Sequence, residues 1–89
     1  MYYNTTHWYD DKINFILNVL FNTTSRSFPA ITIKRALSYL NELDIAATYL
    51  LFSLVCEHLP YRAKMVFAGE DYQGKRQTLI EVMQQRQLN

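Results

Sequence analysis

The chain has 89 residues, of which 49% are hydrophobic, 15% aromatic and 19% charged, and its formal net charge is +1. This length fits one small domain, and the composition lies outside the low-hydrophobicity, high-charge range in which chains stay disordered. The small net charge excludes a broad basic field that would hold a polyanion, which argues against nucleic acid as a partner.

Turn-forming residues are scarce, with two glycines and two prolines in the whole chain. So few turn signals argue against a many-stranded sandwich or barrel. We therefore predict an all-α fold of about five short antiparallel helices. A single helical domain is expected over residues 1–89, with residues 1–9 and 86–89 frayed at its two ends.

A first helix is predicted over residues 10–21, where apolar residues recur at the spacing of one helical face. The recurring residues are Ile13, Ile16, Leu17 and Leu20. Phe15 and Val19 widen this stripe beyond what one core face needs. The first helix is therefore expected to carry surplus apolar surface.

Local signals bound the remaining helices. They are predicted over residues 27–43, 45–58, 60–68 and 75–87. Pro29 and Pro60 suit a first helical turn, because proline is already shaped for it and the amide hydrogen it lacks would be unpaired there. Asp44 is placed to cap the helix that follows it.

The segment AATYLLFSLVC, residues 46–56, contains no charged side chain and is apolar in every angular sector of a helix. A helix of this kind must be surrounded, so we predict that residues 45–58 form the centre of the bundle. The other helices are short and provide too little surface to cover all the apolar side chains of the chain. This favours a protein partner that covers the rest. A well-packed monomeric bundle is the alternative on composition alone.

No pattern for catalysis or metal binding is present. His7 and His58 lie far apart in the sequence, and neither has acidic or cysteine residues at metal-binding spacing. Glu70 and Asp71 could act as general acid and base only in a pocket that gives them different pKa values, and no nearby residues indicate such a pocket. Cys56 is the single cysteine and reads as a packing residue. The sequence therefore predicts a protein that is not an enzyme and needs no metal or cofactor.

The compartment is expected to be the cytoplasm. The N-terminus lacks the basic start and apolar stretch of a secretory signal, and no run approaches the roughly 18 apolar residues that span a bilayer. A single cysteine fits a reducing environment. We therefore expect no contact with a membrane.

The helices over 27–43 and 45–58 also have the spacing of a helix-turn-helix. The start of the second of these helices reads Asp-Ile-Ala-Ala-Thr-Tyr from Asp44, and offers few donors to phosphates or base edges. A small transcriptional co-regulator or mobile-element inhibitor, acting on a protein or on DNA, is therefore the second candidate function.

Residues 36–69 carry the features of a known family. A leucine-rich helix end at Leu40 and Leu43 precedes a helix with Ala46 and Ala47, and the next helix opens with Tyr61 followed by Ala63. In this order the segment resembles the middle of the small TPR-like needle chaperones of bacterial type III secretion systems.

The resemblance implies TPR-like helical hairpins and a chaperone of the bacterial cytoplasm. Such a chaperone pairs with a second small helical chaperone and holds the C-terminal helix of the needle subunit in an apolar groove, as a hetero-oligomer. By this resemblance the groove positions are Ala46, Tyr49, Ser53 and Cys56. Phe15 and Val19 would dock the second chaperone.

Overall fold

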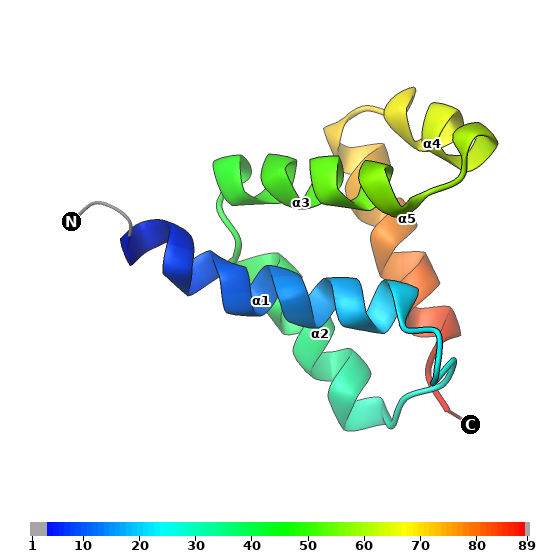
Figure 1. Ribbon diagram of the computed structural model, residues 1–89. Coiled ribbons are helices and arrows are strands. Elements are labelled where there is room, and N and C mark those ends of the chain that lie inside the picture. Colours follow the sequence, from blue (N-terminus) through cyan, green and yellow to red (C-terminus); the bar gives the residue numbers. More distant parts are fainter. Residues whose placement is uncertain (1–3, 89) are drawn as a thin grey trace.

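The computed structural model describes residues 4–88, with side chains described from Asp11 to Leu88. Five helices make up this part of the chain (Figure 1). They are α1 (Asn4–Phe21), α2 (Ala30–Glu42), α3 (Ile45–His58), α4 (Tyr61–Ala68) and α5 (Tyr72–Gln85). Residues 4–88 contain no strand, and the isolated bridge among them joins Phe28 to Gln87. The predicted all-α fold is confirmed.

Two aspartates cap helices. Asp44 Oδ1 accepts a hydrogen bond from the Ala47 amide at 2.8 Å, and Asp71 Oδ1 accepts one from the Gly74 amide at 2.8 Å. Each carboxylate satisfies an amide that the start of a helix leaves unpaired. The predicted cap at Asp44 is confirmed, whereas the Asp71 cap starts the last helix earlier than predicted, at Tyr72.

The starts of α1, α2 and α4 differ in part from the predicted starts. Pro29 and Pro60 stand directly before α2 and α4. The predicted helices over 27–43 and 60–68 include both prolines, so the structure starts α2 and α4 later than predicted, at Ala30 and Tyr61. The first helix begins at Asn4, ahead of the predicted residue 10. Of the residues expected to fray at this end, 4–9 belong to α1 and 1–3 lie outside the described residues.

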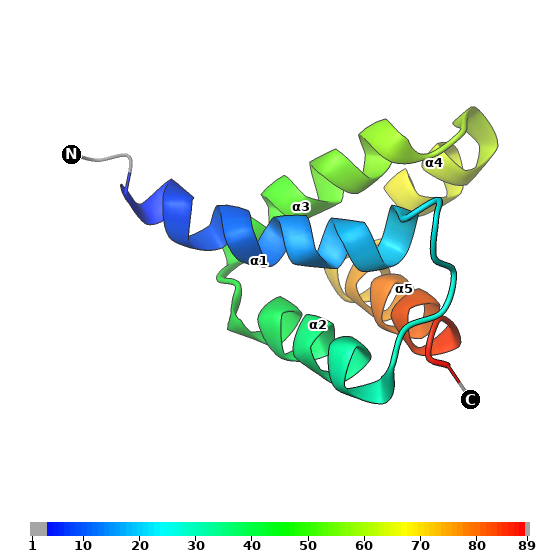
Figure 2. The same ribbon diagram turned by 60° about the horizontal axis from the view of Figure 1, so that its bottom comes forward.

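The other helices are arranged around α1. It packs against α2, α3 and α5, and both views place α2 and α3 on opposite sides of it (Figures 1 and 2). The prediction that the third helix is central is therefore wrong. Because α1 faces three neighbours, it needs a wide apolar band, and its buried side chains are 0% to 3% exposed. They are Ile13, Ile16, Val19 and Leu20.

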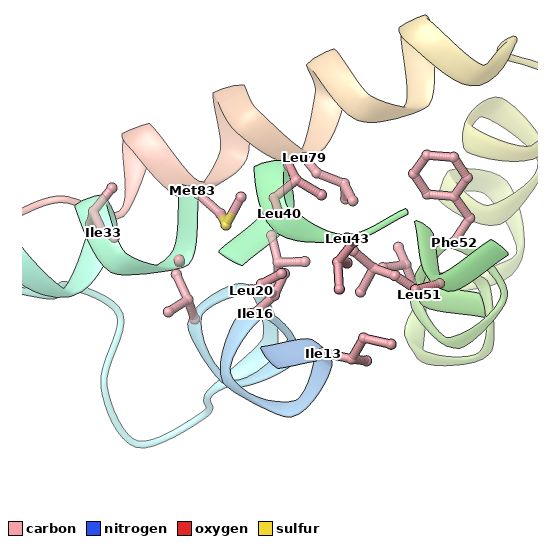
Figure 3. Close-up of a cluster of buried hydrophobic side chains, with 14 of the residues drawn as sticks. Ile13, Ile16, Leu20, Ile33, Leu40, Leu43, Leu51, Phe52, Leu79 and Met83 are labelled. Atoms are coloured by element: carbon pink, nitrogen blue, oxygen red, sulfur yellow. The ribbon is translucent and has the colours of Figure 1, made fainter. Parts of the chain in front are cut away.

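The buried apolar side chains form one cluster (Figure 3). Besides the four from α1, it is built from Ile33, Ala36 and Leu40 of α2, Leu43 in the joint, Ala47, Leu51, Phe52 and Val55 of α3, Phe67 of α4, and Leu79 and Met83 of α5. Burial of each large apolar side chain contributes about 1.5 to 3 kcal/mol, so this cluster is the main source of stability.

The helices do not form an open row of hairpins. In a tetratricopeptide array each repeat touches only its neighbours along the chain, whereas here α5 packs against α1 and α2 as well as against α4. The chain therefore closes around its core. The TPR-like arrangement implied by the resemblance is not confirmed.

The end of the chain is held to the segment that precedes α2. The Phe28 amide donates to the Arg86 carbonyl at 2.8 Å, and the Leu88 amide donates to the Phe28 carbonyl at 2.7 Å. The sequence predicts fraying over residues 86–89. For residues 86–88 that expectation is wrong, because these backbone hydrogen bonds fix them against a distant part of the chain.

Two adjacent leucines of α3 test this packing. Leu51 is 0% exposed and Leu50 is 42% exposed, so the side chains differ in burial while sharing type and helix. Leu51→Ala should lower the free energy of unfolding by about 2 to 5 kcal/mol, and Leu50→Ala by about 1 kcal/mol or less. Urea denaturation followed by circular dichroism measures both. Equal losses for the two variants would contradict the fold.

Candidate functional site

The helix α3 has one buried face and one exposed face, although both are apolar. Its buried face carries Ala47, Thr48, Leu51, Phe52 and Val55. The polar member, Thr48, donates its hydroxyl proton to the Asp44 carbonyl oxygen at 2.7 Å, so its burial leaves no unpaired hydroxyl. The opposite side of the helix meets solvent.

We call this exposed side the outer face of α3. It consists of Ile45, Ala46, Tyr49, Leu50 and Ser53. Ile45 is 65% exposed, Tyr49 is 51% exposed and Leu50 is 42% exposed. No charged residue occurs between Ile45 and Cys56, so the only polar groups on this surface are the hydroxyls of Tyr49 and Ser53. Large apolar side chains gathered at one place mark candidate interaction sites.

The four predicted groove positions share one side of α3. Ala46, Tyr49 and Ser53 are exposed and belong to the outer face, and Cys56 is half-buried at its margin. Their spacing places them at neighbouring angles on a helix of 3.6 residues per turn. The structure thus brings these residues together on a surface that solvent reaches.

The two positions assigned to the first helix fare differently. Val19 is 1% exposed and belongs to the core, so its prediction as a docking residue is corrected. The cause is the central place of α1, which uses its wide apolar stripe against its own chain. Phe15 is half-buried and packs edge-to-face on Tyr39, with ring centroids 5.3 Å apart. Part of its ring remains accessible.

The ring of Tyr49 on the outer face packs against a cluster of aromatic side chains on its inner side. The Tyr49 ring lies 5.8 Å from Phe52 and 5.4 Å from Tyr72 between centroids, and Phe52 also lies 5.8 Å from Phe67. Phe52 and Phe67 are buried, so the exposed Tyr49 ring packs against side chains that belong to the core. The sequence pattern did not single out Tyr72, because its contact with α3 depends on how α5 crosses that helix.

The short helix α4 adds further exposed apolar side chains. Tyr61 is 74% exposed, Val66 is 72% exposed and Met65 is 54% exposed, whereas Phe67 is 3% exposed. Of these four apolar side chains, only Phe67 is buried in the core. The three exposed residues were missed as site candidates because sequence alone did not show that α4 lies at the edge of the fold.

The polar residues weighed for chemistry have structural roles. The Thr78 hydroxyl donates to the Glu70 carboxylate at 2.9 Å, while Asp71 caps α5. The His58 ring stacks on Phe21 with centroids 4.9 Å apart, and its Nδ1 lies 2.8 Å from the Leu54 carbonyl oxygen. The side chain of the other histidine lies outside the described residues.

Among the residues that the structure describes, no group of three or more histidine, cysteine, aspartate or glutamate side chains is placed to hold a metal ion. None of the helices within residues 4–88 combines the length and apolar character needed to cross a membrane. The surface that stands out in the described part of the chain is therefore apolar and lies on α3 and α4.

Comparison with known proteins finds no match: no protein-family model, no curated protein and no solved structure matches this chain.

Two tyrosines test the aromatic base beneath the outer face. Tyr72 is half-buried against Tyr49 and Phe52, whereas Tyr61 is 74% exposed. Tyr72→Ala should lower the free energy of unfolding by about 1 to 3 kcal/mol, and Tyr61→Ala by about 0.5 kcal/mol or less. The measurement is chemical denaturation. A Tyr72→Ala protein as stable as Tyr61→Ala would rule out this support.

Proposed function

We propose that this protein is a non-enzymatic adaptor or chaperone that binds an amphipathic helix of another protein along the outer face of α3. The observation that carries the proposal is the exposure of Ile45, Tyr49 and Leu50 in a helix segment without charge. A helical partner recognises such a surface through apolar side chains spaced three or four residues apart.

The size of the surface indicates how far the partner extends. Burial of three half-exposed apolar side chains stabilises a complex by about 1 kcal/mol each. Association costs at least about 4 kcal/mol, because the two proteins lose translational and rotational freedom. The outer face alone is therefore too small for a stable complex. We extend the proposed interface to Tyr61 and Met65 of α4, which follows at the C-terminal end of α3 (Figure 1).

The resemblance of residues 36–69 supplies a specific partner for this proposal. A needle subunit of a type III secretion system would be held by its C-terminal helix in the bacterial cytoplasm, with a second small chaperone completing a hetero-oligomer. Because Val19 lies in the core, of the two predicted docking residues on α1 only the half-buried Phe15 is available to contact that second chaperone.

The residues at the start of α3 favour a protein partner over DNA. Ile45 and Ala46 occupy exposed positions in its first turn, where a recognition helix would present donors to phosphates and base edges. An apolar side chain lowers the free energy of binding when a partner removes it from water, and it contributes little to binding beside a charged phosphate. We therefore propose no second function.

A charge placed on the outer face tests the proposal. The probe is a fluorescent synthetic peptide of the C-terminal helix of a type III needle subunit, and its binding is measured by fluorescence anisotropy. Tyr49→Asp should weaken binding by roughly a hundredfold, because the partner would bury an unpaired carboxylate. Thr23→Asp, which adds the same charge to the exposed loop after α1, should bind as the wild type does.

Circular dichroism of each variant checks that the helical fold is retained. A peptide of scrambled order controls for composition, and its failure to bind is expected. The proposal of an apolar helix-binding face is wrong if Tyr49→Asp folds and binds the needle peptide with unchanged affinity. Failure of the wild type to bind this peptide would remove the needle subunit as the client.

A further inference from the structure

An open groove lies between α2 and the C-terminal end of α5, two helices that pack side by side (Figure 2). Its volume is about 420 Å³. Because α2 and α3 lie on opposite sides of α1, this groove is separate from the outer face of α3 (Figures 1 and 2). The groove is lined by Ala30, Ile31, Ile33, Lys34 and Leu37 of α2, by Gln84 of α5 and by Gln87 just after α5.

The start of α2 exposes apolar surface at this groove. Ile31 is 64% exposed, and Leu37 is half-buried. The Leu88 amide donates to the Phe28 carbonyl at 2.7 Å, which holds Leu88 close to the start of α2, and the Leu88 side chain is 59% exposed. Large apolar side chains from two distant parts of the chain therefore meet water at one end of the molecule, as is typical of interaction sites.

The cations at this groove have no acidic partner in the described part of the chain. Lys34 lines the groove and is exposed. Arg35 is exposed too, and it lies one turn after Ile31 on the same face of α2. The single ion pair within residues 11–88 joins Lys12 Nζ to Glu42 Oε1 at 3.6 Å. The charges of Lys34 and Arg35 are therefore available to a ligand.

The segments that build the groove are poor in acidic residues. No aspartate or glutamate occurs from residue 12 to residue 41, or after Glu81. Glu81 lies one turn before Gln84, does not line the groove, and accepts a hydrogen bond from Gln77 at 3.2 Å. Arg26, in the loop before α2, is a further exposed cation. The groove therefore has a local excess of positive charge, although the chain as a whole carries only +1.

We infer that this groove binds a short acidic and apolar segment of another protein in an extended conformation. Its apolar side chains pack against Ile31 and Leu37, and its carboxylates pair with Lys34 and Arg35. Successive side chains of an extended segment point to opposite sides, so alternating residues separate the two kinds of contact. The long stems of Lys34 and Arg35 carry their charges above the apolar floor to the carboxylates. This site is independent of the proposed role of α3.

The lining favours an extended peptide over other anions. Gln84 and Gln87 are exposed, and their side-chain amides offer donors and acceptors to the backbone of an extended segment. A helical segment would pair its backbone groups internally and leave these amides unused. A nucleic acid would place phosphates against the apolar side chains of the groove, which desolvates charge without pairing it.

The probe is a fluorescent hexapeptide of alternating aspartate and leucine with blocked ends. Its binding to the full chain is measured by fluorescence anisotropy. We expect saturable binding with a Kd of about 0.1 to 1 mM that weakens as salt is added, because the ion pairs are exposed. The matched peptide with asparagine in place of aspartate should bind roughly tenfold more weakly, since it has the same shape without the charge.

Three variants separate the charge from the apolar contact. Lys34→Glu should weaken binding of the aspartate peptide by roughly tenfold or more and make a lysine–leucine peptide bind more tightly than it binds the wild type. Lys64→Glu makes the same change on the exposed side of α4 and should alter neither affinity by more than about twofold. Ile31→Ser should weaken both the aspartate and the asparagine peptide, because both lose the same apolar contact.

The inference is overturned if the aspartate peptide does not saturate the wild type, or binds it no more tightly than the asparagine peptide. Unchanged binding of the aspartate peptide to Lys34→Glu would overturn it too. An oligothymidylate of the same charge should bind more weakly than the aspartate peptide, and tighter binding would overturn the inference in favour of nucleic acid. The comparisons of ligands on the wild type need no variant, so they decide the question even if a variant fails to fold.

Discussion

The packing of α1 into the angle between α2, α3 and α5 is the constraint on which the rest of the structure depends. Its apolar band faces three neighbours, so Val19 is used inside the fold along with Ile13, Ile16 and Leu20. A helix placed in this way shields one face of each neighbour and leaves the other face to solvent unless further chain covers it. The interior is thus complete around α1, while α3 is covered on one side.

The exposed apolar surface follows from that geometry. Only one face of α3 meets α1 and the rest of the core, and α4 is too short to reach along its outer face (Figure 2). Tyr49 and Leu50 therefore remain in contact with water although their segment is as apolar as a buried helix. In a chain of 89 residues the ratio of surface to volume is high, so few further residues are available to cover this face.

Local signals in the sequence predict the helices well, because they act between residues close in the chain. Pro29, Asp44 and Pro60 each directly precede a helix, and the structure confirms the predicted start after Asp44. The central helix could not be predicted in this way. A fully apolar pattern in α3 and a wide stripe in α1 both permit a central position, and only long-range packing distinguishes them. The groove between α2 and α5 depends on the same long-range contacts, and no local pattern signals it.

The central claim is that the chain leaves the outer face of α3 uncovered while sealing its inner face. Hydroxyl-radical footprinting with mass spectrometry tests this on the purified monomer, because it reports the accessibility of individual side chains. The account predicts strong labelling of Tyr49 and Leu50 and protection of Leu51 and Met83. Protection of Tyr49 and Leu50 to the level of Leu51 in the isolated monomer would contradict it, since the chain would then cover that face by itself.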